Sequence, residues 1–322
     1  MSLRKIILSC LCVFSGFAIA QQSPLYSSYS ASEFSINPAF SGIYDYIPIQ
    51  FVFRSQWSGM DDSPGTATLS GHSSIDDNHG VGLVYQSDVF GLIEQSNATL
   101  TYAYRMPISL DYNMSFGLGT KLGQLTYRTS EAVTHAIFDP VFNVQDETAF
   151  NFDLNFGWAI FSDDLLAGIS VDNLMQSDLE LNESNIRSNS IEREYKVFGH
   201  YYYELRDLYD FALEPAMLFR FTEKGQFQSD VNLNLVYQDF VYAGLMYRVQ
   251  DAFGIMAGFR GRKFNFGYVY EYGTSELIDY NSGSHEFFLG INLEKTRSSQ
   301  NNRWYDRHKT GDWPEGNGIF SR

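Results

Sequence analysis

Apolar and polar residues alternate in about fourteen segments of roughly ten residues each, and this pattern constrains the fold more than any other feature. In the stretch 150–160, large apolar side chains occupy every even position, whereas Asn, Asp, Gly and Ala occupy the odd ones. Successive strand residues face opposite sides of a sheet, so each segment fits a strand with one apolar and one polar face. Strands of this length and period are typical of transmembrane β-barrels.

Two further features distinguish a membrane barrel from a soluble β-sandwich, whose strands also alternate. Aromatic residues make up 16% of the chain, and several stand at segment ends, as Tyr102 and Tyr104 do, where the aromatic girdles of a barrel lie. The gaps between segments also alternate between long and short. We therefore expect an all-β fold, a transmembrane antiparallel β-barrel of about 14 strands in the outer membrane. The expected strands are 47–57, 65–74, 80–88, 93–105, 110–121, 149–160, 164–173, 191–204, 208–221, 227–238, 240–248, 252–261, 263–273 and 284–294.

The lengths of the gaps predict the orientation of the barrel. If the N-terminus starts in the periplasm, the longest gaps, 122–148, 174–190 and 274–283, all lie outside the cell, as they do in bacterial outer-membrane proteins. An even number of strands returns the chain to the periplasm. Pro215 counts against the strand 208–221, because proline cannot donate to a ladder on both sides.

Residues 1–20 are expected to form a signal peptide for export. Two basic residues precede a largely apolar run, and Ala18 and Ala20 fit an A-x-A cleavage site. Cys10 and Cys12 both fall inside this segment, so the mature chain has no cysteine for a disulfide or a thiol nucleophile. No later segment approaches 18 consecutive apolar residues, and helical membrane spans are therefore not expected.

The charge balance argues against nucleic acid as a partner. The chain has 22 Lys and Arg against 38 Asp and Glu, a net charge of −16. Removing the signal peptide takes away two positive charges and no acid, which gives 20 against 38 and a net charge of −18. Such acidity disfavours binding to phosphate backbones.

The tail 295–322 differs from the rest of the chain in charge. It carries six Lys and Arg and three Asp and Glu, a net charge of +3, together with two Trp and one Tyr. Exposed aromatics beside arginine are frequent at binding hot spots. We therefore predict a periplasmic tail that is either solvated or docked on a periplasmic protein. The expected contact residues are Arg303, Trp304, Tyr305, Arg307 and Trp313.

No catalytic or cofactor-binding signature emerges. The six histidines have no metal-ligand spacing, and neither G-x-S-x-G nor H-E-x-x-H occurs. Ser70 and His72 could suggest an outer-membrane acyl hydrolase. The simpler interpretation is that both are ordinary polar residues that face the lumen or lie in a loop. We expect no catalytic residue, metal or cofactor.

Several charged residues lie on the polar faces of the expected strands. On the lipid side each basic one would cost about 2–4 kcal/mol at the bilayer midplane, so they are expected to line the lumen. Two interpretations remain open: a salt-bridged filling of the interior, which we favour, or an anchor for a plug or passenger segment. These residues are Arg54, Asp153, Glu214, Arg220, Arg248, Arg260 and Glu271.

Three short blocks near the start of the mature chain are the most specific local signal: 35–42 (SINPAFSG), 53–59 (FRSQWSG) and 63–66 (SPGT). They resemble the N-P-A-x-x-G, R-x-Q-W-x-G and P-x-T blocks of the PorP/SprF family of outer-membrane proteins of type IX secretion in Bacteroidetes. Weaker resemblance continues through glycine-rich strands and covers residues 23–294. The matching positions are Asn37, Pro38, Ala39, Gly42, Arg54, Gln56, Trp57, Pro64 and Thr66.

The blocks also have a local physical meaning. Pro38 fixes its own φ and disfavours helix at Asn37, and Gly42 permits a turn before the first strand, so we expect a rigid periplasmic lead-in over 21–46. Residues two apart on a strand share a face. Arg54 and Gln56 should therefore point into the lumen and Trp57 to lipid at the outer rim, with Pro64 in the following loop.

Together these features predict one barrel domain, 47–294, between the lead-in and the tail. The family resemblance implies a role in type IX secretion: binding secreted cargo with a C-terminal sorting domain, including adhesins for gliding motility in some members, and contact with periplasmic components. An outer-membrane transporter or porin for hydrophobic or small solutes is the first alternative. An apolar lumen pocket connected to a lateral opening would favour it. The acyl hydrolase is the second.

Overall fold

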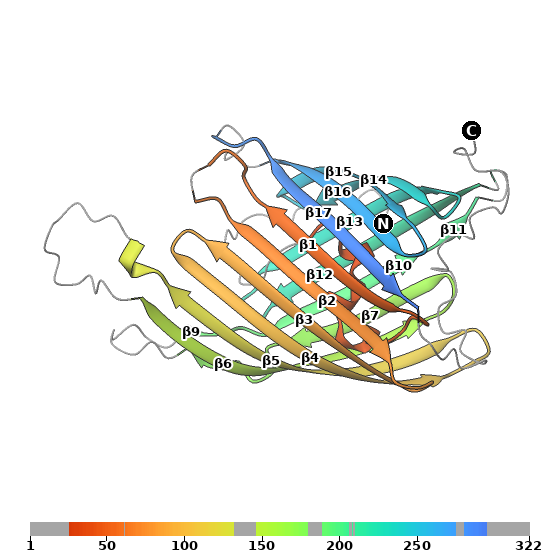
Figure 1. Ribbon diagram of the computed structural model, residues 1–322, viewed down its shortest axis with the longest axis horizontal. Coiled ribbons are helices and arrows are strands. Elements are labelled where there is room, and N and C mark those ends of the chain that lie inside the picture. Colours follow the sequence, from red (N-terminus) through yellow and green to blue (C-terminus); the bar gives the residue numbers. More distant parts are fainter. Residues whose placement is uncertain are drawn as a thin grey trace, which may run out of the picture.

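The computed structural model describes residues 26–60, 62–131, 146–179, 189–205, 208, 210–274 and 280–294. Fourteen antiparallel strands form a closed ring, in which β1 pairs with both β2 and β17 (Figure 1). Within the described part of the chain, no helix is long and apolar enough to cross a membrane. The strands of the ring are β1 (Ile47–Ser55), β2 (Gly65–Ser74), β3 (His79–Phe90), β4 (Ile93–Pro107), β5 (Asn113–Tyr127), β6 (Glu147–Phe161), β7 (Leu165–Asp172), β10 (Glu194–Tyr201), β12 (Phe211–Thr222), β13 (Phe227–Tyr237), β14 (Val241–Arg248), β15 (Ala252–Arg260), β16 (Phe264–Gly273) and β17 (Ser284–Leu293).

The predicted barrel and its strand number are confirmed, and most strand ends agree within three residues. The largest difference is β5, which continues to Tyr127 instead of ending at 121. Its last residues pair with β4 on one side and β6 on the other, as far as Ile93 and Glu147. Polar residues such as Gln124 interrupt the apolar face there, so the sequence pattern ends before the ladder does.

Pro215 lies inside β12, and the surrounding pairing explains how it is accommodated. It is opposite Leu233 of β13, while on the other side the pairing of β12 with β10 ends at Ala216, which is opposite His200. The short strand β11 (Tyr203–Glu204) resumes the pairing farther along β12. The missing N–H of proline therefore falls at a break in the neighbouring strand.

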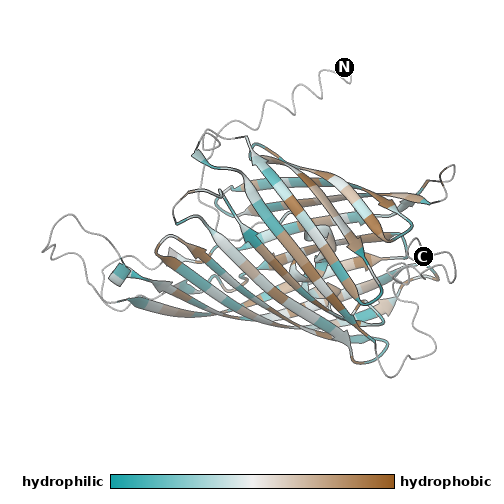
Figure 2. Cartoon of the chain, turned by 45° about the horizontal axis from the view of Figure 1, so that its top comes forward, coloured by the Kyte–Doolittle hydropathy of each residue, from teal (hydrophilic) through white to brown (hydrophobic). Residues whose placement is uncertain are grey.

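Hydrophilic and hydrophobic residues alternate along the strands (Figure 2), and their burial shows that the two kinds face opposite sides of the wall, as predicted. On β6, Phe150 and Phe152 are exposed on the outer face, whereas Asn151, Asp153 and Asn155 are buried. The predicted lumen charges follow the same rule. Arg54, Asp153, Glu214, Arg220, Arg248 and Glu271 are buried, and Arg260 is half-buried.

Connections of different lengths distinguish the two ends of the barrel. One end, here called the long-loop end, carries the connections 128–146, 173–193 and 274–283; the opposite, short-turn end carries turns such as 162–164 and 238–240. The first group includes a small separate sheet of β8 (Asp178–Leu179) and β9 (Asn189–Ser190), and the helix η4 (Thr129–Glu131). This alternation is the one expected from the sequence.

Candidate functional site: a lumen plug and the cavity beside it

Residues 26–44, here called the plug, lie inside the barrel (Figure 1). The sequence predicted a lead-in ahead of the barrel, whereas its described part crosses the lumen. Three 3-10 helices form its path, η1 (Tyr29–Ala31), η2 (Glu33–Ser35) and η3 (Pro38–Phe40). A strand period is absent because the chain turns tightly here instead of extending. The chain's own N-terminal segment therefore occupies part of the lumen.

The centre of the plug is held by Asn37, the first residue of the N-P-A-x-x-G block. Its Oδ1 accepts a hydrogen bond from the Ala39 N–H at 2.8 Å, and Pro38 occupies the first position of η3, as expected for an Asn cap followed by proline. Its Nδ2 donates to the carbonyl oxygens of Trp158 and Ile169, at 3.1 and 3.0 Å. One side chain thus both starts the helix and fixes it to β6 and β7.

Glycines in the barrel wall make room for this block. A Cβ at Gly157 of β6 would overlap Asn37, and one at Gly117 of β5 would overlap the backbone of Pro38 and Ala39. Gly80, Gly82 and Gly168 face the plug in the same way. Several of these glycines belong to the weaker part of the family resemblance, and their common role is close contact between the plug and the wall.

Gly42 ends the plug at the short-turn end. Its φ of +69° favours glycine, and a side chain there would also overlap the backbone of Ser73. Its N–H donates to His72 Nδ1 at 2.8 Å, and its carbonyl oxygen accepts from the buried Arg105 guanidinium. His72 therefore holds a turn of the plug, an arrangement that does not prepare it as a base for Ser70.

Apolar packing fixes the middle of the plug against one side of the barrel. Phe40 is completely buried, and the rings of Phe40 and Tyr29 meet the Phe198 ring of β10 at centroid distances of 5.8 and 6.2 Å. Edge-to-face pairs of this kind add to the stability gained by burial. The cluster consists of Tyr29, Phe34, Ile36, Ala39, Phe40, Ile43, Tyr44, Ala159, Phe161, Leu166, Phe198, Ala216 and Leu218.

Glu33 is buried within the plug, with 3% of its surface exposed. The Tyr44 hydroxyl donates to its Oε1 at 3.2 Å. Burial raises the pKa of the Glu33 carboxyl to about 7, because the charged form loses its hydration.

Ion pairs hold the other end of the plug, near the long-loop end. Arg54 binds Glu271 through two bonds of 2.7 Å, and its Nη1 lies 3.6 Å from Glu286. The Glu286 carboxylate accepts from the backbone N–H groups of Ser27 and Ser28, at 2.8 Å each. The predicted lumen charges therefore anchor a plug as well as fill the interior, which joins the two interpretations left open by the sequence.

Arg248 extends this cluster across the barrel. Its Nε lies 2.8 Å from Asp230 and its Nη1 lies 3.2 Å from Glu271, while Nη2 donates to the Ser27 hydroxyl at 3.1 Å. Arg220 binds the second oxygen of Asp230 at 2.7 Å. Charge-assisted bonds are stronger than neutral ones, so this network holds Ser27 firmly.

The R-x-Q-W block divides at the end of β1. Arg54 faces the lumen as predicted, but β1 ends at Ser55, so Gln56 and Trp57 are not strand residues. Trp57 is half-buried, has a φ of +48°, and donates its backbone N–H to the Ser284 hydroxyl at 3.2 Å. The predicted strand 47–57 is therefore two residues too long, and the strand alternation does not apply to Gln56 and Trp57.

Pro64 and Thr66 flank the start of β2. Pro64 lies in the connecting loop, as predicted, and its carbonyl oxygen accepts from the Gln56 N–H at 2.9 Å. Thr66 is buried and donates its hydroxyl to Asp88 of β3. The block thus shapes the rim at the long-loop end.

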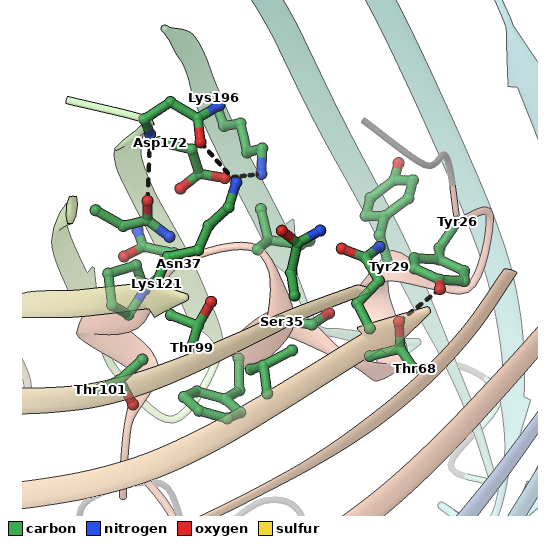
Figure 3. Close-up of a pocket in the computed structure, with 18 of the residues that line it drawn as sticks. Tyr26, Tyr29, Ser35, Asn37, Thr68, Thr99, Thr101, Lys121, Asp172 and Lys196 are labelled. Atoms are coloured by element: carbon green, nitrogen blue, oxygen red, sulfur yellow. Dashed lines mark hydrogen bonds and ion pairs between the residues drawn. The ribbon is translucent and has the colours of Figure 1, made fainter. Parts of the chain in front are cut away.

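A cavity of about 130 Å³ lies between the plug and the wall, toward the long-loop end (Figure 3). Tyr26, Tyr29 and 34–38 of the plug border it, and its wall comes from β2–β7, β10 and β12. The predicted tail contacts, Arg303, Trp304, Tyr305, Arg307 and Trp313, lie outside the described residues, as does the expected signal peptide.

Comparison with solved structures finds membrane barrels of low similarity. The CymD monoaromatic hydrocarbon channel is 9% identical, with 87% of this chain and 95% of that chain covered at a TM-score of 0.47. A Pseudomonas aeruginosa FadL homologue is 8% identical, with coverages of 77% and 89% and a TM-score of 0.45. Omp33 of Acinetobacter baumannii is 8% identical, with coverages of 79% and 100% and a TM-score of 0.44. No curated protein matches the sequence significantly.

The sequence profile of one protein family matches most of the chain. It is described as "Type IX secretion system membrane protein PorP/SprF" and matches residues 18–291. That range includes the plug, its docking glycines and all but the last residues of the barrel. The chain therefore belongs to the PorP/SprF family of outer-membrane proteins of the type IX secretion system.

Proposed function

We propose that this barrel serves type IX secretion by binding secreted cargo that carries a C-terminal sorting domain, and that it supports the cargo's export or its retention at the cell surface. Adhesins are the expected cargo, with gliding motility as the outcome in organisms that glide. Periplasmic secretion components would bind the side of the short turns, with the tail residues Arg303–Trp313 as the expected contact. The barrel itself catalyses no reaction in this proposal.

The observation that carries this proposal is the plug. The block that most specifically resembles the family, 35–42, packs across the lumen with its Asn37 and Gly42 fixed to the wall. A segment held by apolar packing, close backbone contact and buried ion pairs closes a passage instead of lining one. A closed barrel supports a binding role more than passive diffusion.

The plug also bears on the two alternatives. A transporter for hydrophobic solutes favours an apolar pocket, but the cavity beside the plug is of mixed character, with Thr, Asn, Gln and charged residues beside apolar ones such as Phe34, Ile36 and Val84. A hydrolase would need His72 as a base for Ser70, and its Nδ1 instead accepts from Gly42. Neither alternative has a specific observation in its favour.

Deletion of the gene in its own host tests the function. We expect cargo with C-terminal sorting domains to disappear from the cell surface or medium, and complementation with the full chain to restore it. Uptake of small and hydrophobic solutes should stay unchanged. Normal cargo display combined with a defect in solute uptake would support the transporter instead.

A second experiment addresses the periplasmic partners. A chain truncated after Glu294 keeps every barrel strand, so it should insert normally. We expect it to co-purify with fewer periplasmic proteins than the full chain does, and to secrete less cargo. An identical set of co-purifying proteins, with unchanged secretion, would leave the tail without a role in coupling.

A further inference from the structure

The plug closes the cavity on one side, so a ligand can reach it from the long-loop end. The plug borders it through Tyr26 and 34–38, and the Tyr26 hydroxyl is within 2.5 Å of Thr68 Oγ1 on β2 (Figure 3). At about 30 Å³ for each molecule of liquid water, a volume of about 130 Å³ has room for roughly four waters. A side chain or chain end of a ligand fits such a space, and the plug directs its approach from the long-loop end.

Lys121 of β5 brings a positive charge to this cavity without a carboxylate as its partner. Its Nζ donates to Oδ1 of Asn173 at 2.6 Å, and no carboxylate of the described residues lies within 4.0 Å of it. The neighbouring Lys196 is different, because its Nζ lies 2.5 Å from Asp172 and 3.4 Å from Glu194. A partly buried ammonium whose direct hydrogen-bond partner is neutral can take an anion as its ion-pair partner.

The rest of the wall supplies neutral groups that can pair with a polypeptide backbone. Amides and hydroxyls border the cavity at Gln86, Gln95, Asn97, Thr99 and Asn155. Asn97 is 9% exposed, and its Oδ1 has no hydrogen-bond partner within the part of the chain that the structure describes. Such amides both donate and accept, as the peptide group itself does.

The cations of the wall differ in whether a carboxylate already pairs with them. Lys196 lies beside Asp172 and Glu194, and Arg220 binds Asp230 through its Nη2. The Arg220 Nε has no hydrogen-bond partner among the described residues. Of the three cations Lys121, Lys196 and Arg220, Lys121 is the one without a carboxylate within 4.0 Å in the described part of the chain.

We propose that the cavity binds a carboxylate carried by an extended peptide, with Lys121 as the ion-pair partner and the amide wall on the peptide backbone. The identification of a peptide rests on the proposed function, since cargo would supply it. The carboxylate is either an Asp or Glu side chain or the C-terminus of the peptide. Both present the same chemistry to Lys121.

Peptide binding to the purified full-length barrel tests this site. Three fluorescent Gly-Ser octapeptides serve as probes: one with a central Asp and an amidated C-terminus, one with Asn instead and the same amide, and one neutral with a free C-terminus. We expect the Asp peptide, the free-terminus peptide or both to bind, and the Asn amide not to. The peptides that bind show whether the cavity recognises a side-chain carboxylate, a C-terminal carboxylate or both.

Variants of Lys121 show whether the ion pair carries the binding. Lys121→Gln should raise Kd for the acidic probe about tenfold or more, as for loss of a charge-assisted hydrogen bond. Lys121→Arg should keep most of the affinity. The matched control is Lys263→Gln, which removes the same charge from an exposed turn at the opposite end. A heat-dependent band shift in detergent gels checks that each barrel is folded.

Three outcomes would overturn the site: no binding by either acidic probe at millimolar concentration, equal binding by the Asn amide, or an unchanged Kd for Lys121→Gln. An oligouronate is an acidic sugar chain without a peptide backbone. If it bound as tightly as the acidic peptide, the assignment of a peptide would be overturned. Failure here is distinguishable from failure of the proposed function. Cargo display in cells can depend on the gene while the isolated cavity binds none of the probes.

Discussion

The two ends of the plug are held by different physical means. At 37–42, the backbone packs on glycines of the wall and Asn37 bonds to strand carbonyls, so the fit depends on shape. At 27–28, the chain is held by carboxylates and guanidinium groups, so the fit depends on charge. An added side-chain atom should disturb the end at 37–42, whereas loss of a charged partner should disturb the end at 27–28. The two ends should therefore respond to different substitutions.

Deleting 26–44 should have the largest effect, because it removes both contacts at once. The fourteen strands stay intact, since all begin at Ile47 or later. In planar bilayers we expect the full chain to show little conductance and the deletion variant to show stable ion channels. Similar conductance in both would mean that the plug does not close the lumen.

Arg54→Ala should have the next largest effect, confined to the end held by charge. It removes both bonds from Arg54 to Glu271, which keeps Arg248, and it removes the guanidinium beside Glu286, and breaking a buried pair typically costs about 3–5 kcal/mol. We expect the barrel to remain in the membrane while Ser27 becomes accessible, measured by labelling of a Ser27→Cys variant. Unaltered labelling would show that the ion pairs do not anchor the plug.

Gly157→Ala should loosen the end held by shape. The added methyl group overlaps Asn37, and overpacking of this kind costs about 1–3 kcal/mol. The expected result is greater protease sensitivity of the plug, with Ser27 labelling less affected than by Arg54→Ala. Gly65→Ala is the matched control, because a Cβ there meets nothing within 4 Å.

The smallest expected effect is a pH dependence of plug docking. The docked pKa of Glu33, about 7, lies above its ordinary value of 4.5. The docked plug therefore binds a proton more tightly than the released plug. The contribution of Glu33 to the stability of docking is fully present below pH 4.5 and is lost as pH rises through 7. A difference of about 2 kcal/mol is expected between pH 5 and 7. Glu33→Gln should abolish this dependence in the labelling assay.

The barrel was predictable from the sequence because its pattern is local. Each strand repeats polar and apolar positions over about ten residues, and even Val236 and Val269, which lie on polar faces, find apolar clusters in the lumen. The position of the plug was not predictable in this way. Asn37 bonds to carbonyls 121 and 132 residues away, and no local period records such distances.

The candidate site was predictable in part. The sequence identified 35–42 as specific and Arg54 as a lumen residue, and it left an anchor role open, but it placed Trp57 on a strand that ends before it. Lys121 carried no signal of its own, because a lone lysine in an alternating segment is ordinary. Its surroundings come from β5, β7 and β10, which lie in one stretch of the barrel wall although they are far apart in the sequence.

The seam of the barrel has a consequence for assembly. Arg54 of β1 stands opposite Glu286 of β17, so these two residues mark where the first strand meets the last. The same Glu286 accepts from Ser27 and Ser28, 259 and 258 residues earlier in the chain. The earliest part of the plug therefore gains its two bonds to Glu286 only once the final strand is in place. Closing the ring also completes the contacts that hold the plug, and a barrel that closes empty leaves Glu286 without the two backbone N–H donors of Ser27 and Ser28.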